Sequence, residues 1–144
     1  MGSLAHDGAR TELVRNATLQ LCRYPHGLTC ADLVRSIETV IRGQVIFVPE
    51  YQERIQTPER LLKEIASRGI AYGDCDDAAT LAASMLLSVG IQDLRFVAMR
   101  YGDVDYFEHV ILEVACNGEW KRIDPTVDRR TFYVNVSERM EVYL

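Results

Sequence analysis

The sequence lacks the features of several protein classes. It has no run of basic residues, and its formal net charge is −5 at pH 7. Because nucleic-acid binding depends on clustered Lys and Arg, we expect no nucleic-acid partner. No apolar stretch is long enough for a transmembrane helix, and residues 1–7 do not show the basic start and apolar segment of a signal peptide. These absences predict no membrane association and a cytoplasmic location.

Cysteine is scarce and shows no pairing pattern. The four cysteines are Cys22, Cys30, Cys75 and Cys116. No two of them form a C-x-x-C pair, which argues against structural zinc. Without an export signal a disulfide framework is not expected either. We therefore expect no metal, and we expect Cys22, Cys30 and Cys116 to be free thiols that pack as small hydrophobic residues.

The composition and the first half of the chain indicate a helical layer. Of the 144 residues, 48% are hydrophobic and 26% are charged, which is typical of one globular domain. Apolar residues at helical spacing, capping residues and closing glycines mark the helices. The expected helices cover about residues 11–22, 30–42 and 57–69, with a fourth after Gly73, and residues 45–48 are extended. The fourth helix is apolar on most of its surface, so we expect it to be central.

The second half of the chain changes to strand patterns. We expect strands at 94–101, 107–116 and 119–124, with short strands at 131–136 and 141–144. Asn117-Gly118 is a strong signal for a two-residue hairpin turn. Helices followed by hairpin-linked strands indicate an α+β fold in which N-terminal helices pack on an antiparallel β-sheet.

The hairpin turn makes a prediction about two polar residues. If Asn117-Gly118 is a two-residue turn, Ile111 faces Asp124, and His109 lies on the same face as the diagonal neighbour of Asp124. A three-residue loop would place the two residues on opposite faces. A carboxylate bonded to one imidazole nitrogen fixes the tautomer and leaves the other nitrogen for a nucleophile. Taken alone, His109 is also explained as an ordinary sheet histidine, and Asp124 as a turn residue before Pro125.

Cys75 lies in the first turn of the expected central helix. The partial positive charge of a helix N-terminus favours a thiolate, and the backbone N–H groups there can receive an oxyanion. Asp74, Asp76 and Asp77 surround it, however, and negative charge disfavours a thiolate. The arrangement therefore requires these carboxylates to cap the helix, as an acidic capping box from Asp74 to Asp77 would, or to pair elsewhere. The alternative is a small buried cysteine with no chemical role.

Three motifs together resemble the transglutaminase-like branch of the papain-like cysteine protease superfamily. They are GDCDDAATL at 73–81, EHV at 108–110 and WKRIDPT at 120–126, and the similarity spans about residues 57–126. The short stand-alone bacterial and phage members are the most similar. The resemblance implies one transglutaminase-like domain over 1–144 with a core at about 30–136. It also implies Cys75 as nucleophile, His109 as general acid/base and Asp124 as the orienting carboxylate. Asp77 is interpreted as structural.

The resemblance implies an enzyme without metal or organic cofactor. It would act on a peptide, isopeptide or glutamine amide bond of a protein or peptide substrate through a thioester acyl-enzyme. The Cys75 N–H is one expected oxyanion donor, and the second is sought among Tyr51, Gln52, Gln56 and Tyr72, with Gln52 preferred because an amide is a fixed donor. The alternatives are a crosslinking acyltransferase, or a protein-binding or phage-assembly module with little or no turnover.

Overall fold

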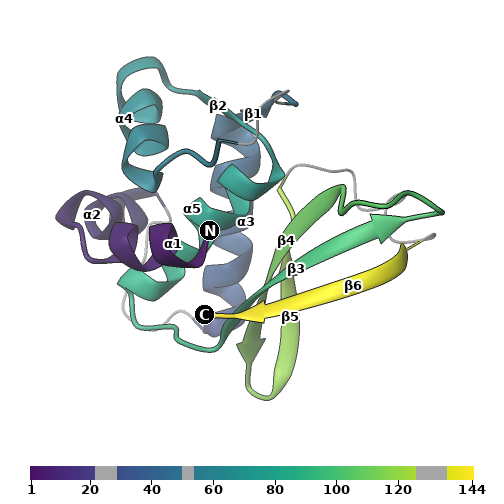
Figure 1. Cartoon of the computed structure of the whole chain (residues 1–144). Coiled ribbons are helices and arrows are strands. Elements are labelled where there is room, and N and C mark those ends of the chain that lie inside the picture. Colours follow the sequence, from purple (N-terminus) through teal and green to yellow (C-terminus); the bar gives the residue numbers. More distant parts are fainter. Residues whose placement is uncertain (22–28, 50–53, 126–135) are drawn as a thin grey trace.

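The protein has a helical layer beside an antiparallel sheet. The computed structural model describes residues 1–21, 29–49, 54–125 and 136–144. In these residues the helices gather on one side and a four-stranded sheet lies on the other (Figure 1). The α+β fold expected from the sequence is therefore confirmed. The elements are α1 (Gly2–Ala9), α2 (Glu12–Leu21), α3 (Cys30–Gln44), β1 (Val45–Phe47), α4 (Pro58–Arg68), β2 (Ala71–Gly73), α5 (Cys75–Ser88), β3 (Leu94–Tyr101), β4 (His109–Cys116), β5 (Glu119–Ile123) and β6 (Val136–Tyr143).

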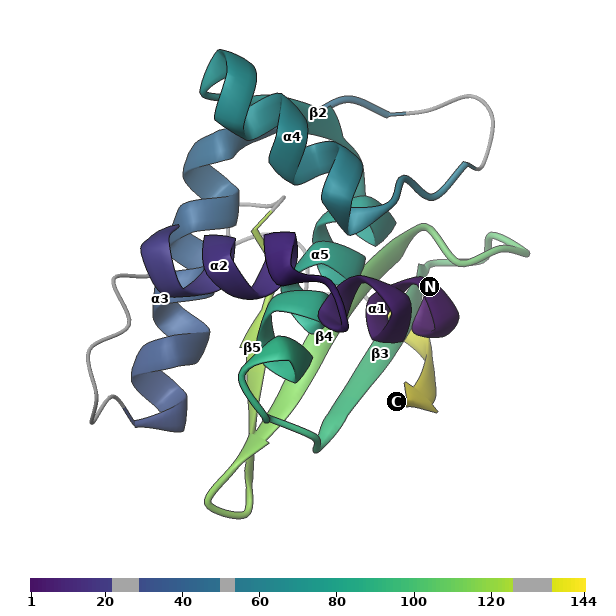
Figure 2. The same ribbon diagram turned by 90° about the vertical axis from the view of Figure 1, so that its left-hand side faces the viewer.

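Helix α5 is the centre of the helical layer, as its apolar surface predicts. Eleven of its fourteen residues are buried, so it has almost no face toward water. Helices α1, α2, α3 and α4 pack around it, and the sheet covers another side (Figure 2). Helix α1 approaches closely at Gly8, where a Cβ would lie 2.7 Å from Ser84 Oγ. The Ser84 hydroxyl donates to the Ala5 carbonyl at 2.9 Å and joins the two helices.

The sheet has the strand order β5-β4-β3-β6 and is antiparallel throughout. Asn117 and Gly118 have φ values of +54° and +82°, which is the conformation of a type I′ hairpin turn. Cys116 pairs with Glu119 and Glu113 with Arg122, as a two-residue turn at Asn117-Gly118 requires, so the hairpin register expected from the sequence is confirmed. The register places His109 and Asp124 at the end of the hairpin away from the turn.

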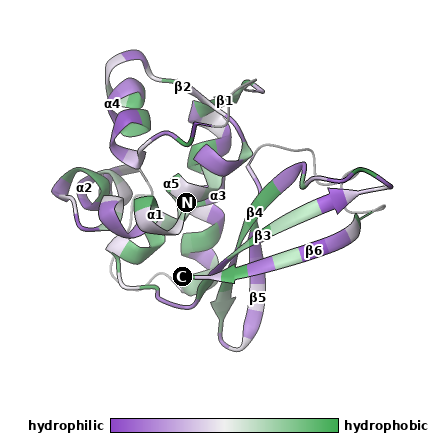
Figure 3. Ribbon diagram, in the orientation of Figure 1, coloured by the Kyte–Doolittle hydropathy of each residue, from purple (hydrophilic) through white to green (hydrophobic). Residues whose placement is uncertain are grey.

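Some elements differ from the sequence prediction. The sequence patterns did not predict α1 and β2, and β2 pairs in parallel with β1 as a separate two-stranded ribbon. Residues 136–143 form one strand, β6, at the edge of the sheet, where the sequence suggested two short strands. The expected strand over 131–136 lies largely outside the described residues. Hydrophobic and hydrophilic residues alternate along the second half of β6 (Figure 3), and Met140 and Val142 are exposed.

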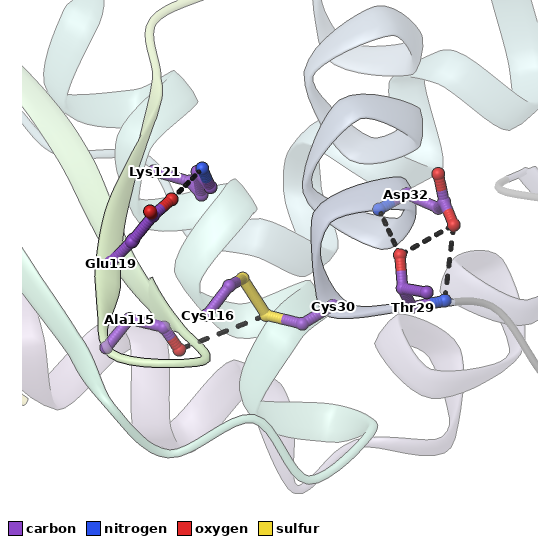
Figure 4. Close-up of a disulfide and its surroundings, with 7 residues drawn as sticks. All are labelled: Thr29, Cys30, Asp32, Ala115, Cys116, Glu119 and Lys121. Carbon is purple, nitrogen blue, oxygen red and sulfur yellow. Dashed lines mark hydrogen bonds and ion pairs between the residues drawn. A yellow bond between two sulfur atoms is a disulfide. The ribbon is translucent and has the colours of Figure 1, made fainter.

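The expectation that Cys30 and Cys116 are free thiols is wrong. They form a disulfide with a Cα–Cα distance of 5.7 Å, and it joins the first residue of α3 to the last residue of β4 (Figure 4). Eighty-six positions separate the two cysteines in the sequence, so only the packing of α3 beside the hairpin brings them together. Cys75 is free, and Cys22 lies outside the described residues.

None of the helices in the described segments combines the length and the apolar character that crossing a membrane requires.

Candidate active site

Cys75 is the first residue of α5, where the chain leaves β2 and turns into the helix. Asp74 is the N-cap, and its carboxylate accepts the Asp77 N–H at 3.3 Å. The Asp77 carboxylate accepts the Asp74 N–H in return, also at 3.3 Å, which completes the predicted capping box. A Cβ on Gly73 would lie 2.9 Å from Asp77 Oδ2, so a glycine is needed for this close approach. Cys75 is half-buried at this helix end.

Asp77 holds the helix start in place, as the sequence suggested. It is fully buried, and it accepts the Gln56 N–H at 2.6 Å and the Gln56 side-chain amide at 2.9 Å. The same amide also donates to the Tyr72 carbonyl at 2.9 Å. Burial raises the pKa of Asp77, although the hydrogen bonds from Gln56 oppose this. Asp77 and Gln56 therefore fix the segment that carries Cys75.

The acidic residues beside Cys75 carry less negative charge than their number suggests. Burial raises the pKa of Asp76 to about 7, and a hydrogen bond with Asp74 and the charges of Asp74 and Asp77 act in the same direction. Asp76 is therefore partly protonated at neutral pH. Because Asp74 and Asp77 cap the helix, the requirement derived from the sequence is met. The carboxylate oxygens of these three residues lie within 4.8 Å of one another, because Asp74 and Asp77 form the capping box and Asp76 is hydrogen-bonded to Asp74.

His109 and Asp124 form a buried pair at the open end of the hairpin. The distance from His109 Nε2 to Asp124 Oδ2 is 2.9 Å, and the two residues are 4% and 3% exposed. Asp124 lies one residue beyond the last described pair of the ladder, Leu112–Ile123. The predicted juxtaposition is thus present, because the two-residue turn sets the register of both strands.

The thiol of Cys75 acts on the same imidazole. Burial lowers the pKa of His109, but hydrogen bonds to Asp124 and to Cys75 and the charges of both groups outweigh this effect and raise the pKa to about 9. Because Nε2 is bonded to Asp124, Nδ1 is the ring nitrogen left for the sulfur. The structure therefore brings together all three residues singled out in the sequence, Cys75, His109 and Asp124.

Two residues of α3 contact the backbone of Asp124. The Asp124 N–H donates to Glu38 Oε1 at 3.3 Å, and the Arg42 guanidinium donates to the Asp124 carbonyl at 2.7 Å. Glu38 and Arg42 are themselves 3.4 Å apart. A cavity of about 680 Å³ lies beside these contacts, lined by Ala31, Val34, Arg35, Glu38, Trp120, Lys121, Arg122 and Asp124. No local pattern predicts this contact beyond the i, i+4 spacing of Glu38 and Arg42 on one helix face.

Tyr101, the last residue of β3, is a further residue near the site. Burial raises the pKa of its phenol to about 12, with contributions from the charges of Asp124, Glu108 and Cys75. The phenol is therefore a neutral hydrogen-bond donor at ordinary pH. It lies two residues beyond Met99, which pairs with His109 across the sheet. Its strand pattern alone gave no reason to single it out.

The four residues considered as the second oxyanion donor lie in different environments or outside the described residues. Gln52, the preferred one, and Tyr51 lie outside the described residues. The side-chain amide of Gln56 is bonded to the Tyr72 carbonyl and to Asp77, so it serves the helix start. The Tyr72 side chain is 46% exposed on β2. The second donor therefore stays a prediction.

Comparison with known protein families identifies the fold family. The model of the transglutaminase-like superfamily matches residues 21–125, which is more than half of the chain. The chain belongs to the transglutaminase-like superfamily. The matched span of this transglutaminase-like chain contains Cys75, His109 and Asp124. The resemblance drawn from the three motifs is thereby confirmed at the level of the family.

A solved structure with the same transglutaminase-like fold is that of a "putative protease" from Parabacteroides distasonis ATCC 8503. The two align with a TM-score of 0.60 and 15% sequence identity, over 85% of this chain. The aligned part is 25% of the other protein, so this chain spans about a quarter of its length. At this identity the likeness concerns the fold. The search of curated proteins found no match.

Proposed function

We propose that the protein is a cysteine-dependent hydrolase or acyltransferase that acts on a peptide, isopeptide or glutamine amide bond. Cys75 is the nucleophile, His109 the general acid/base and Asp124 the residue that orients the imidazole. The observation that carries the proposal is the imidazole of His109, which is bonded at 2.9 Å to a buried carboxylate and whose pKa is raised by that carboxylate and by the free thiol of Cys75. A histidine with these two neighbours is the arrangement that nucleophilic catalysis by cysteine requires.

The geometry supports a specific order of steps. His109 takes the proton of Cys75 through Nδ1, and the thiolate attacks the carbonyl carbon of the substrate. The Asp77 and Ala78 N–H groups are already bonded to Asp74. The Cys75 N–H at the helix start is therefore the donor for the oxyanion. The protonated His109 then gives its proton to the leaving amine, which leaves an acyl group on the sulfur. Asp124 stays ionised and stabilises the imidazolium.

The second half of the reaction decides the class of enzyme. Water that attacks the thioester gives hydrolysis or deamidation, whereas a primary amine gives a new amide bond. In both cases His109 accepts the proton of the attacking group and returns it to the sulfur as the bond breaks. No step requires a metal ion. The proposed substrate is a protein or a peptide.

Alkylation of the thiols tests whether Cys75 is activated. We expect iodoacetamide near neutral pH to modify Cys75 faster than Cys22, as measured by intact-mass spectrometry and peptide mapping. The His109→Asn variant should lose this preference, because the thiol no longer has a base. Equal rates for Cys75 and Cys22 in the folded protein would favour a binding module on the same fold.

Turnover of a glutamine-containing protein tests the reaction itself. We expect ammonia release from casein or from a glutamine peptide, and incorporation of an added primary amine if the protein is a transferase. Peptide cleavage without ammonia would assign it as a peptidase. The Cys75→Ser variant should reduce any of these activities by at least about a thousandfold, while its circular dichroism matches that of the wild type. Full activity of Cys75→Ser would exclude the proposed nucleophile.

A further inference from the structure

We propose that Glu38 and Arg42 of α3 are positioning residues that hold the backbone of Asp124 so that its carboxylate meets His109. We call these two residues the α3 clamp. The inference rests on the proposed function, because it assigns to the clamp a role in the same site. The clamp acts through Asp124, whose backbone both residues contact.

The clamp forms hydrogen bonds with both backbone polar groups of Asp124, its N–H and its carbonyl. Glu38 Oε1 accepts the Asp124 N–H at 3.3 Å, and Arg42 donates to the Asp124 carbonyl at 2.7 Å. The same Glu38 oxygen accepts from Arg42 at 3.4 Å, which closes a triangle between two side chains and one backbone residue. Glu38 is 5% exposed, so its bond to the Asp124 N–H forms in a largely dry environment and is worth more than a similar bond at the surface, whereas Arg42 is partly exposed.

The position of Asp124 in the chain explains why it needs such contacts. The described ladder of β4 and β5 ends at the pair Leu112–Ile123, and Pro125, which has no N–H, follows Asp124. A buried backbone N–H or carbonyl without a partner is costly. The clamp supplies partners from a helix at the end of the described ladder. It thereby fixes the main chain of the residue whose side chain orients His109.

Glu38 also covers part of Asp124 at the wall of a large cavity. Glu38 and Asp124 both line the cavity of about 680 Å³ between α3 and β5. Removal of the Glu38 side chain would enlarge this space around Asp124 and admit more water. Water would weaken the interaction of Asp124 with the imidazole, since charges interact less in a medium of higher dielectric constant. The clamp thus holds the Asp124 backbone in place, and Glu38 also limits the access of water to the Asp124 carboxylate.

A titration of His109 tests the clamp without any substrate. The pKa of His109 is measured by NMR on protein with labelled histidine, and the spectrum of His109→Asn assigns its signal among the histidines. We expect the pKa to fall from about 9 toward 6.5 in Glu38→Ala and in Arg42→Met. We expect Glu38→Gln and Arg42→Lys to retain most of the raised value, because each keeps one acceptor or donor for the Asp124 backbone. The alkylation rate of Cys75 should fall about tenfold or more in the first two variants.

The pair Arg60 and Glu64 on α4 provides a matched control. These residues form an i, i+4 ion pair at 3.5 Å that does not contact the site, so Arg60→Met and Glu64→Ala should leave the titration of His109 unchanged. Arg42 is partly exposed in the wild type, so we expect Arg42→Met to fold. If the pKa of His109 in this folded variant equals the wild-type value, the clamp is only structural and the inference is overturned. Fast alkylation of Cys75 in that variant would leave the proposed nucleophile in place, so the two proposals fail separately.

Discussion

The titration of His109 gives the candidate site a pH dependence with a definite sign. The pKa of His109 is raised to about 9 from 6.5, chiefly by Asp124 and Cys75 acting against burial. The stabilisation from the raised pKa is fully present below pH 6.5, and it is lost as the pH rises through 9. We expect Asp124→Asn to lower the His109 pKa and to reduce the free energy of unfolding by about 3 kcal/mol at pH 6.

The difference in the free energy of unfolding between wild type and Asp124→Asn should therefore become smaller between pH 6 and pH 10. It can be measured by urea unfolding at several pH values, with His6→Asn as the control, because His6 lies on α1, away from the site. A difference that stays constant over this range would mean that Asp124 does not interact with the charged imidazole.

The sequence predicted the three candidate residues because their signals are local. The helix start around Cys75 depends on residues 73–77, and the meeting of His109 and Asp124 depends on a two-residue turn and the period of a strand. Glu38, Arg42 and Tyr101 were missed because their contacts depend on how α3 and β3 pack against the hairpin. The disulfide was missed for the same reason, since Cys30 and Cys116 show no spacing pattern.

At the scale of the elements, one buried carboxylate joins the four strands of the sheet. Glu113 on β4 is 3% exposed and forms ion pairs with Arg95 of β3 at 2.7 Å, Arg122 of β5 at 3.3 Å and Arg139 of β6 at 3.2 Å. Burial raises the pKa of Glu113, but the hydrogen bonds and charges of Arg95 and Arg139 outweigh this and lower it. This network ties the edge strand β6 to the hairpin.

We expect Glu113→Gln to destabilise the protein by about 2–3 kcal/mol. Loss of a partner from a buried ion pair leaves uncompensated charge, and the partly exposed Arg122 and Arg139 reduce the cost below that of a fully buried pair. Because the folded-state pKa is lowered, the contribution of Glu113 is present above its usual value of 4.5 and is lost as the pH falls through the folded value.

Chemical unfolding at pH 7 and at pH 3 tests this prediction. The free energies of unfolding of wild type and Glu113→Gln should differ more at pH 7 than at pH 3. Glu119→Gln is the matched control, since Glu119 is exposed and pairs with Lys121 within the same strand at 2.6 Å, so its effect on stability should be much smaller. Equal effects of the two substitutions would show that the network of Glu113 does not hold the sheet together.

The elements that the sequence predicted well are those with strong local signals. Helix α4 begins at Thr57-Pro58 and ends at Gly69, and β3 has the predicted bounds of 94–101. Helix α1 was missed because its eight residues include two glycines and show no regular apolar face. It is held in place by α5, through the Ala5–Ser84 bond and the contact at Gly8. Tertiary packing, which a single segment does not reveal, decides such short elements.

At the scale of the whole molecule, the disulfide ties the helical layer to the sheet. Cys30 begins α3, the helix that carries the clamp, and Cys116 ends β4, the strand that carries His109. A bond of this kind persists mainly in oxidising compartments, so it points away from the cytoplasmic location expected from the sequence. The location stays a prediction, and the bond itself has a measurable effect.

Reduction of the disulfide should destabilise the fold by about 2–5 kcal/mol, because the bond closes a long loop in the unfolded chain. Urea unfolding with and without tris(2-carboxyethyl)phosphine measures this effect, and Cys30→Ala/Cys116→Ala should unfold at the same urea concentration in both conditions. If the reductant leaves the wild-type midpoint unchanged while Cys30 and Cys116 become available for alkylation, the bond does not contribute to stability.

Loss of the disulfide should loosen the N-terminal end of α3. Glu38 and Arg42 lie two to three turns further along the helix and should stay packed on Asp124. We therefore expect the folded fraction of the reduced protein to keep the fast alkylation of Cys75.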